Sequence, residues 1–358
     1  MSSGGVAQLV AIGAQDAFLV GNPQVSFFQS MYKHHTNFSQ VVDRQVIQGN
    51  PTSGGMTTVK FERKGDMIGY VYLVGNNGSN TYATYDWSNV VNYAELYIGG
   101  QLIDTQDSKF TEYLAVDLFA QNLSKSALGS FHGGAGTLSY FYPFRFFFCE
   151  NWQSALPLVG LQYHDVEIRI YWNQPNSDPT YGVIKNWDCY TQYIFLDDSE
   201  REMFSRKTQY MLMTQVQKSI PVGSLKMQEI VFNHPMKYLV SSSSANQNSS
   251  NALTSSSNMV LVQINGTDIG DYKYACPNFT SAMGYYHAPF SYGNDNDFFF
   301  FPFCLDSSKM QPTGSLNFSR LDSVRIISQS VVLTDPVYGV NYNILKIEKG
   351  MGALMYSN

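Results

Sequence analysis

Histidines and their neighbours are the first residues in this sequence whose types could do chemistry. His164 precedes Asp165, the residue types of a general base and the carboxylate that orients it. Neighbours in a strand point to opposite faces of a sheet, so this pair cannot form a hydrogen-bonded dyad without a bulge. The same geometry argues against metal binding by His34 and His35. We therefore expect neither a catalytic dyad nor a metal site.

Cysteine spacing also gives no sign of chemistry. The four cysteines, Cys149, Cys189, Cys276 and Cys304, contain no Cys-x-x-Cys pair of the kind found in zinc and redox sites. We interpret them as buried, reduced thiols that act as small apolar groups, which suits a reducing compartment. The Gly-rich stretch 133–137 lacks the Lys-Ser/Thr of a phosphate-binding loop and predicts a flexible loop. No cofactor is expected.

The sequence contains one pattern of segments twice. AELYIGGQLID at 94–104 corresponds to VLVQINGTDIGD at 260–271. FYPFRFFFCE at 141–150, followed by LQYHDVEIRI at 161–170, corresponds to DFFFFPFCLD at 297–306, followed by NFSRLDSVRII at 317–327. Such self-similarity predicts two copies of one structural unit side by side. A duplicated β unit is more typical of a building block than of a catalyst.

Composition narrows the class of function. Charged residues make up 14% of the 358 residues, against roughly 25% in an average globular chain. Aromatic residues make up 15%, a pattern typical of surfaces that pack against other protein copies. The net charge of −6 argues against direct nucleic-acid binding, which needs a basic surface. The first 21 residues do not resemble a signal peptide, and no stretch approaches the roughly 20 apolar residues of a membrane span.

The elements that must position these residues are mostly strands. Apolar and polar residues alternate at 94–98 and 166–170, the pattern of antiparallel sheets with one buried face. Further strands are expected near 41–48, 56–63, 66–74, 142–149, 188–197, 225–232, 236–241, 259–265, 297–304, 322–333 and 340–347. Short helices are expected from Asp107 or Ser108 to Leu118 and at 197–204. The Ser-rich segment 241–258 predicts a solvated loop.

These patterns predict an all-β protein with short helices in its loops. We place an extended N-terminal arm at 1–25, a first β domain at 26–204, a linker at 205–219 and a second β domain at 220–358. Many short strands with few helices favour sandwiches or jelly rolls.

Short motifs distributed from about residue 7 to the C-terminus resemble a known family. The chain is similar to the major capsid proteins of nucleocytoplasmic large DNA viruses, of the chlorovirus, phycodnavirus and iridovirus type. The similar residues are Gly13-Ala14-Gln15-Asp16, Gly21-Asn22-Pro23-Gln24, Phe27-Phe28, Tyr32, Thr36-Asn37-Phe38, Leu156-Pro157-Leu158, Leu161-Gln162-Tyr163-His164, Phe195-Leu196-Asp197, Glu200-Arg201, Phe232-Asn233-His234-Pro235, Lys237-Tyr238-Leu239, Pro312-Thr313-Gly314, Asn317-Phe318-Ser319-Arg320, Tyr342-Asn343-Ile344-Leu345 and Gly350-Met351-Gly352.

The resemblance implies a fold and an assembly. It implies two tandem eight-stranded antiparallel jelly rolls, and a homotrimer that forms a pseudo-hexameric capsomer. Such capsomers tile an icosahedral shell around an internal membrane and a double-stranded DNA genome. The expected partners are further copies of the chain, neighbouring capsomers and minor capsid proteins, with the membrane near the inner face. The expected location is the virion, after assembly in the host cytoplasm.

The resemblance also implies where functional residues lie. The N-terminal arm is expected at the inner face of the shell, where it anchors capsomers. The expected assembly residues are Gln15, Asp16, Asn22, Pro23, Phe27, Phe28 and Tyr32. Glycosylation is expected in outer loops, with Asn246, Asn248 and Asn251 of the Ser-rich segment as sites.

Alternative functions remain at this point. The loops of the second jelly roll are short for the family, which fits a minor capsid paralog as well as the main shell protein. Jelly rolls also serve as lectins, so a carbohydrate-binding module that recognises the host is a second hypothesis. A third is a metal enzyme on a cupin-like jelly roll, although His132 and His164 lack the required close spacing.

Overall fold

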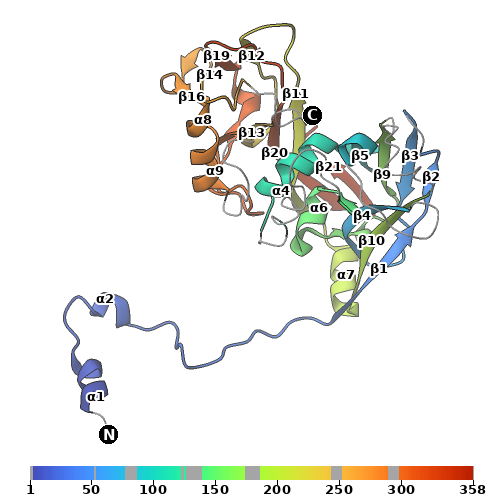
Figure 1. Ribbon diagram of the computed structural model, residues 1–358. Helices are drawn as coiled ribbons and strands as arrows, with labels where there is room; N and C mark the ends of the chain where they lie inside the picture. Colours follow the sequence, from blue (N-terminus) through green and yellow to red (C-terminus); the bar gives the residue numbers. More distant parts are fainter. Residues whose placement is uncertain are drawn as a thin grey trace. The chain divides into compact units, whose positions relative to one another are not determined.

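A computed structural model describes most of the chain (Figure 1). The described residues are 3–51, 54–76, 87–121, 125, 139–173, 186–242, 252–288 and 298–357. The chain divides into two compact units, Met1–Asn37 and Phe38–Asn358. We describe each unit by itself.

The first unit is the N-terminal arm. We predicted an extended arm, but it contains two helical turns, α1 (Ser3–Val10) and α2 (Ala17–Val20). Gly-rich sequence did not suggest helix, yet the apolar residues between the glycines tolerate short helical turns. From Gly4 to Asn37 nearly every side chain is exposed. The unit ends at Asn37, beyond the boundary of 25 that we set from the sequence.

The second unit begins with two facing antiparallel sheets. One sheet has the strand order β1-β10-β4-β7, with β8 paired to β4, and the other has the order β2-β3-β9-β5-β6. Their bounds are β1 (Phe38–Gln45), β2 (Ile47–Gly49), β3 (Met56–Lys60), β4 (Met67–Asn76), β5 (Val91–Ile98), β6 (Gln101–Asp107), β7 (Phe141–Pro143), β8 (Leu156–Pro157), β9 (Val166–Trp172) and β10 (Asn186–Leu196).

Two more antiparallel sheets follow along the chain. One has the order β11-β20-β13-β17, with β18 paired to β13 and β21 to β20, and the other has the order β12-β19-β14-β15, with β16 paired to β14. Their bounds are β11 (Gln209–Ser219), β12 (Met227–Glu229), β13 (Pro235–Ser242), β14 (Met259–Ile264), β15 (Thr267–Asp268), β16 (Lys273–Tyr274), β17 (Phe298–Pro302), β18 (Leu316–Asn317), β19 (Val324–Ser328), β20 (Val337–Glu348) and β21 (Met351–Leu354).

The two pairs of sheets have the same topology. Leaving aside the short strands β2, β8, β16, β18 and β21, each pair has two layers of four strands. In each pair the first, eighth, third and sixth strands form one layer, and the second, seventh, fourth and fifth form the other. This order is that of an eight-stranded jelly roll. The predicted fold of two tandem jelly rolls is confirmed.

Short helices occupy the connections. They are α3 (Trp87–Val90), a π-helical turn η1 (Phe110–Leu114), α4 (Ala115–Leu118), α6 (Phe147–Glu150), α7 (Asp198–Arg206), α8 (Ala275–Asn278), α9 (Ser281–His287) and the 3₁₀ turns η2 (Trp152–Ser154), η3 (Leu158–Gly160) and η4 (Phe318–Arg320). The helices predicted near 108–118 and 197–204 are confirmed. In α7, the Asp197 carboxylate accepts from Asp198 N at 3.0 Å and caps the first turn.

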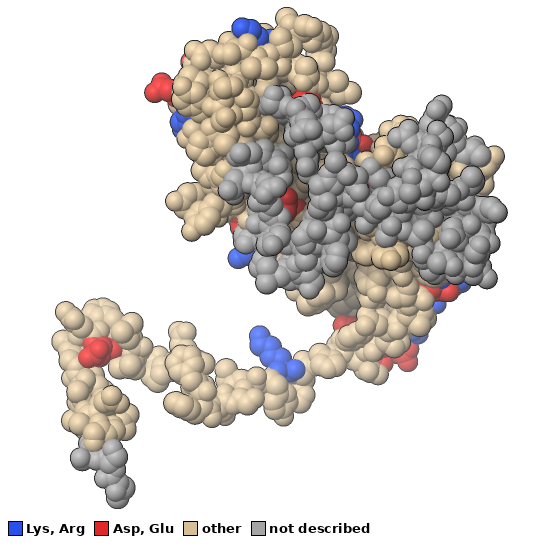
Figure 2. All heavy atoms as spheres, in the orientation of Figure 1, with Lys and Arg blue, Asp and Glu red and all other residues tan. Residues whose placement is uncertain are grey.

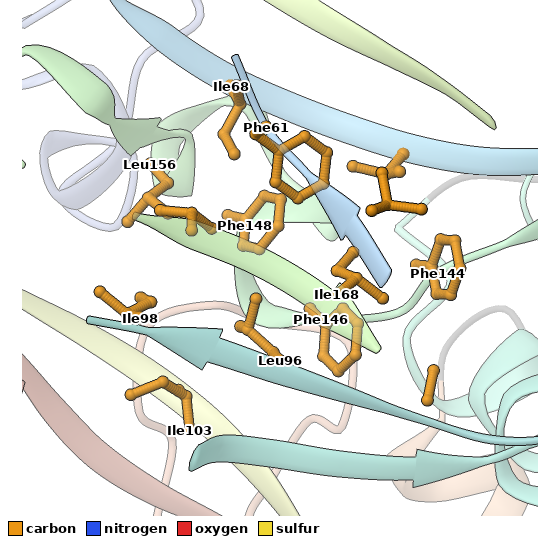
Figure 3. Packing of buried hydrophobic residues seen from close by; sticks show 14 of the residues in the cluster. Phe61, Ile68, Leu96, Ile98, Ile103, Phe144, Phe146, Phe148, Leu156 and Ile168 are labelled. Carbon is orange, nitrogen blue, oxygen red and sulfur yellow. The ribbon is translucent and has the colours of Figure 1, made fainter. Parts of the chain in front are cut away.

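Three buried apolar clusters form the cores of the second unit. The first lies between the sheets of the first jelly roll, where phenylalanine and aliphatic side chains interdigitate (Figure 3). The second lies inside the second jelly roll and includes Met236, Leu239 and Phe299. The third lies between the jelly rolls and draws residues from both. We call this third cluster the junction core.

Strand β20 connects all three clusters. Its first residue, Val337, belongs to the core of the second jelly roll, and Tyr338 and Val340 belong to the junction core. Leu345 and Ile347, near its end, pack in the core of the first jelly roll. A strand of the second jelly roll therefore also packs side chains into the core of the first.

Three local expectations differ from the structure. The segment expected to be a strand at 142–149 is strand only to Pro143, after which α6 begins at Phe147. Within the segment expected to be a linker, 209–219 form strand β11, which pairs with β20 along its whole length. The domain boundaries themselves stay a prediction.

The Ser-rich segment is the third difference. We expected 241–258 to be solvated, but Ala252 and Leu253 are buried in the core of the second jelly roll. Asn258 is fully buried and donates from Nδ2 to Ala252 O at 2.7 Å and to Ser328 Oγ at 2.9 Å. These hydrogen bonds satisfy a buried amide and fold the segment back onto the sheet.

Candidate assembly site

The junction core is built from aromatic side chains of both jelly rolls. Phe110 and Leu114 of η1 come from the first jelly roll, and Tyr238, Phe300 and Tyr338 come from the second. The ring centroids of Phe110 and Tyr338 are 5.6 Å apart, and those of Tyr238 and Phe300 are 5.3 Å apart. Each such side chain contributes about 1.5–3 kcal/mol when fully buried, so the junction joins the jelly rolls as firmly as a domain core.

Asp104 forms a polar connection beside this core. It lies in β6 of the first jelly roll, and its Oδ1 accepts from Val216 N in β11 of the second at 2.9 Å. Its Oδ2 accepts from Gln106 Nε2 at 2.8 Å. Burial raises the pKa of Asp104 to about 7, and the hydrogen bonds from Val216, Gln106 and Thr105 oppose that rise.

Asp107, at the end of β6, forms a second connection. Its Oδ2 accepts from Lys218 Nζ at 2.6 Å and from the Tyr338 hydroxyl at 2.7 Å, both in the second jelly roll. Its Oδ1 accepts from Phe110 N at 2.9 Å and so caps the helical turn that supplies the junction core. One carboxylate thereby fixes the turn and ties it to two strands of the other jelly roll.

Amides complete the polar layer. Gln215 in β11 donates from Nε2 to Ile103 O in β6. Its Oε1 accepts from Asn343 Nδ2 at 2.9 Å and from Asn341 Nδ2 at 3.3 Å. All three amide side chains are buried, and the hydrogen bonds offset the cost of removing them from water.

The β20–β21 hairpin closes over the first jelly roll. Tyr163 N donates to Gly350 O at 2.9 Å, and His164 Nδ1 lies 2.9 Å from Gly352 O and 3.2 Å from Gly352 N. A Cβ at position 352 would lie 2.7 Å from a side-chain carbon of Leu161, so the approach requires glycine. Asp165 pairs instead with Lys60 at 2.7 Å. His164 and Asp165 therefore have separate partners, although they precede β9 rather than lie in a strand as we assumed from the sequence.

Sequence reasoning missed the junction residues. Polar residues such as Asp104, Asn341 and Asn343 occur within otherwise buried strands, and that contrast is the signal that could have identified them. Which strands they face depends on long-range topology, which residue spacing alone does not contain.

The arm holds all the residues predicted to act in assembly. Phe27, Phe28 and Tyr32 are exposed to 91%, 101% and 81%. Asp16 Oδ2 accepts from Gly13 N at 2.7 Å, which shapes the turn before α2. Gln15, Asn22 and Pro23 are exposed, and Asn22 has a φ of +51°. Within the arm these residues are not gathered into one site.

The surface of the second unit also exposes apolar residues. Ile220, Val222 and Val231, around β12, are exposed to 65%, 83% and 83%. In the view of Figure 2, Lys, Arg, Asp and Glu are scattered over the described part of the surface. Such a surface suits contacts between proteins. The predicted glycosylation sites Asn246, Asn248 and Asn251 lie outside the described residues.

Chemical sites can be assessed over the same described ranges. There, no group of three or more His, Cys, Asp and Glu side chains could hold a metal ion. Cys189 and Cys304 are buried. Cys149 is partly exposed as a residue, but burial raises the pKa of its thiol, which packs against the core of the first jelly roll. Cys276 is partly exposed, so the expectation of four buried thiols is wrong for this residue. No helix among the described residues is long and apolar enough to span a membrane.

Comparison with known sequences adds independent evidence. A family model for the major capsid protein N-terminus matches residues 26–197. The major capsid protein of Pyramimonas orientalis virus is 30% identical, and the match covers 99% of this chain and 100% of that protein. The major capsid protein of Paramecium bursaria Chlorella virus 1 is 28% identical, with the same coverage.

Solved structures show the same fold. The VP54 protein of PBCV-1 matches with a TM-score of 0.76 at 22% identity, covering 93% of this chain and 100% of that one. The Faustovirus major capsid protein matches with a TM-score of 0.65 at 10% identity, covering 94% of each chain. With its two jelly rolls and its full-length relatives, this chain belongs to the major capsid protein family of large DNA viruses and is a non-enzymatic component of the virion capsid.

Proposed function

We propose that three copies of this chain form a capsomer with a pseudo-hexameric outline, and that these capsomers tile an icosahedral shell. The supporting observation is the identical strand order of two jelly rolls joined by one buried core. Two similar blocks held rigidly in one chain give six blocks in a three-fold ring. The exposed apolar residues around β12 are suited to contacts between copies.

The arm has a separate role in this proposal. It anchors capsomers at the inner face of the shell through neighbouring capsomers, minor capsid proteins or the surface near the internal membrane. Its support is the exposure of Phe27, Phe28 and Tyr32, aromatic side chains that find no cover within the arm itself. The enclosed genome is double-stranded DNA, which the chain does not bind directly, since its net charge is −6. Assembly takes place in the host cytoplasm.

Light scattering on a sizing column tests the trimer. We expect the purified chain to elute as one species with about three times the chain mass of 40.3 kDa. Electron microscopy of that species should show a hexagonal outline. A stable, folded monomer at micromolar concentration would contradict the proposal of an autonomous capsomer.

Removal of residues 1–25 separates the two parts of the proposal. The truncated chain should keep its trimer mass, because the jelly rolls begin after the arm. It should fail to form normal shells when expressed with the other virion proteins. Normal particles from the truncated chain would disprove the role of the arm while leaving the trimer intact.

A further inference from the structure

A β-bulge in β13 directs a lysine toward the junction between the jelly rolls. The pairing of β13 with β20 shifts between Met236 and Tyr238, which leaves Lys237 as the extra residue. Met236 packs in the core of the second jelly roll and Tyr238 in the junction core. Bulges re-aim single side chains in this way and often occur beside functional sites. Lys237 is only 3% exposed.

The surroundings of Lys237 offer its ammonium neutral acceptors at hydrogen-bond distance. Its Nζ donates to Ser307 O at 2.6 Å and to Lys309 O at 2.9 Å. The rings of Tyr238 and Tyr342 lie 5.9 and 5.8 Å from Nζ. The nearby charge of Asp306 attracts the ammonium, but within the described ranges the ion pair of that carboxylate is with Lys309, at 3.9 Å. Burial lowers the pKa of Lys237 to about 8, and the charge of Asp306 opposes this fall only in part.

A pocket of about 50 Å³ opens beside this side chain. Its walls come from both jelly rolls and include Phe119, Met213 and Lys237. Ser307 also lines it, and the Ser307 side chain is fully buried, with an Oγ that has no hydrogen-bond partner. A buried hydroxyl without a partner requires an explanation, such as a bound water or ion. The volume is enough for a few waters or for one small ion.

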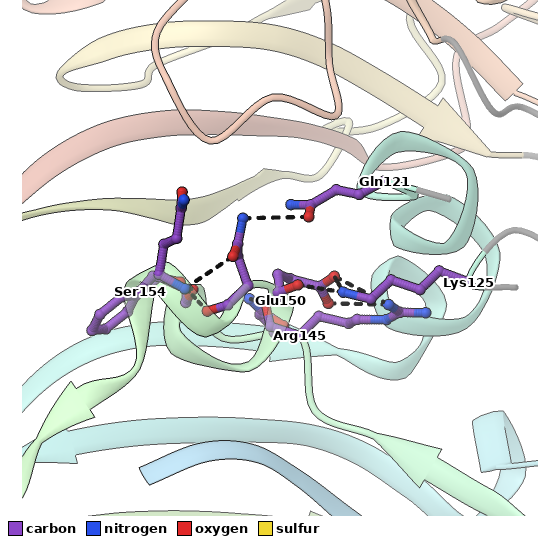
Figure 4. Close-up of polar contacts among 9 residues, drawn as sticks. Gln121, Lys125, Arg145, Glu150 and Ser154 are labelled. Carbon is purple, nitrogen blue, oxygen red and sulfur yellow. Dashed lines mark hydrogen bonds and ion pairs between the residues drawn. The ribbon is translucent and has the colours of Figure 1, made fainter. Parts of the chain in front are cut away.

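The charges near the pocket favour an anion. Glu150 is the one carboxylate on its walls, and two cations already pair with it (Figure 4). Arg145 Nη1 lies 3.0 Å from Glu150 Oε1, and Lys125 Nζ lies 3.5 Å from Glu150 Oε2. Lys309 also lines the pocket, and its Nζ lies 3.9 Å from Asp306 Oδ2. Asp306 itself is not part of the lining. Of the two lysines that line the pocket, Lys237 is therefore the one that makes no ion pair with a described carboxylate.

We propose that this pocket binds a small monovalent anion, of halide or formate size, between the Lys237 ammonium and the Ser307 hydroxyl. Lys237 has one N–H beyond those donated to the two carbonyls, and Ser307 supplies a second donor. The bound anion neutralises the buried ammonium and holds the loop that follows β17 against the first jelly roll. Anion binding thereby stabilises the arrangement of the two jelly rolls.

The competing explanation is that Lys237 only holds the loop after β17 through its two hydrogen bonds to carbonyl groups. In that case these two hydrogen bonds explain why Lys237 is buried, and the pocket contains water. The chain would then respond to ionic strength but not to the identity of the anion. The two explanations differ in whether chloride stabilises the fold more than a larger anion does at equal ionic strength.

Thermal unfolding of the full chain in chloride or gluconate provides the test. Gluconate is too large for the pocket, so replacing it with chloride at constant ionic strength changes only the occupancy. Above saturation, each tenfold increase in chloride should raise the Tm by about 2–4 °C. Lys237→Met should abolish this dependence, and Ser307→Ala should weaken the apparent chloride affinity about tenfold or more. Lys226→Met is the matched control, because Lys226 is an exposed lysine of the same jelly roll.

Crystals grown in bromide give a direct readout. An anomalous peak between Lys237 Nζ and Ser307 Oγ is expected. Equal Tm values in chloride and gluconate, or bromide crystals with only water in the pocket, would overturn the proposal. So would a loss of chloride dependence in Lys226→Met as large as that in Lys237→Met. If Lys237→Met does not fold, the Ser307→Ala titration and the bromide crystals still decide the question.

Discussion

Aromatic side chains are exposed to solvent in the arm but buried in the junction core. Phe27 and Phe28 of the arm are 91% and 101% exposed, whereas Phe110 and Phe300 at the junction are fully buried. All four are phenylalanines. Whether a phenylalanine is buried therefore depends on which segments the fold packs against it. The residue type alone does not determine its burial.

The difference indicates which contacts already stabilise the folded unit and which require a further surface. At the junction, η1 and β20 of the same unit cover the aromatic rings, so the free energy of burial stabilises that unit. In the arm, the same free energy becomes available only when the rings contact a surface outside the arm. Substitutions in the two regions should accordingly separate stability from assembly.

The largest expected effect is that of Phe110→Ala. The ring of Phe110 is fully buried and contacts Phe119 and Tyr338. Its truncation should lower the free energy of unfolding by about 3–5 kcal/mol, because it leaves a cavity between the jelly rolls. Urea denaturation of the purified chain measures the loss.

Phe18→Ala in the arm is the control for this substitution. Phe18 is 92% exposed, so its truncation should change the free energy of unfolding by less than about 0.5 kcal/mol. If both variants lost the same free energy of unfolding, the arm and the junction core would not differ in their contribution to stability.

A pH dependence should also mark the junction. The folded pKa of Asp104, about 7, lies above its ordinary value of 3.8. Between these values the folded chain holds a proton that the unfolded chain has released, so the free energy of unfolding falls as pH rises from about 4 to about 7. Above that range the contribution is constant. Its full size is on the order of 4 kcal/mol.

Asp104→Asn removes this titration. The difference in the free energy of unfolding between variant and parent should shift in favour of the variant as pH rises from 4 to 7. Chemical denaturation at several pH values measures the slope. Asp268→Asn, at an exposed aspartate, is the control substitution. A flat difference for Asp104→Asn would mean that its carboxylate titrates normally.

The smallest effect on the folded chain is expected for Phe27→Ala combined with Phe28→Ala. Both side chains are exposed, so the Tm of the purified chain should stay within about 1 °C of the parent. Shell assembly should nevertheless decline, since the arm loses two of its highly exposed aromatic rings. Unchanged particle yield would place the anchoring contacts elsewhere in the arm.

Local patterns in the sequence were sufficient for much of the fold. Alternation at 94–98 and 166–170 identified β5 and β9, and the repeated segments identified two equivalent units. These features depend on neighbours within a few residues, where periodicity is informative. The aromatic run 144–149 misled us, because a strand and a buried helical turn such as α6 look alike when nearly every residue is apolar.

Local sequence patterns predicted only part of the candidate site. Motifs placed Phe27, Phe28 and Tyr32 in an exposed arm, but nothing local connects Asp107 with Tyr338, whose hydrogen bond spans 231 positions. Likewise, the burial of Lys237 arises from a bulge and from a loop 70 residues further along. Such contacts depend on how strands from distant segments pair.

The path of β20 has a consequence for synthesis on the ribosome. The core of the first jelly roll includes Met213, Leu345 and Ile347, and Leu354 packs against it. The last of these residues are translated after nearly all of both jelly rolls. During synthesis, the core of the first jelly roll therefore stays incomplete until the second jelly roll has been translated. The apolar surface exposed in that interval is of the kind that chaperones bind.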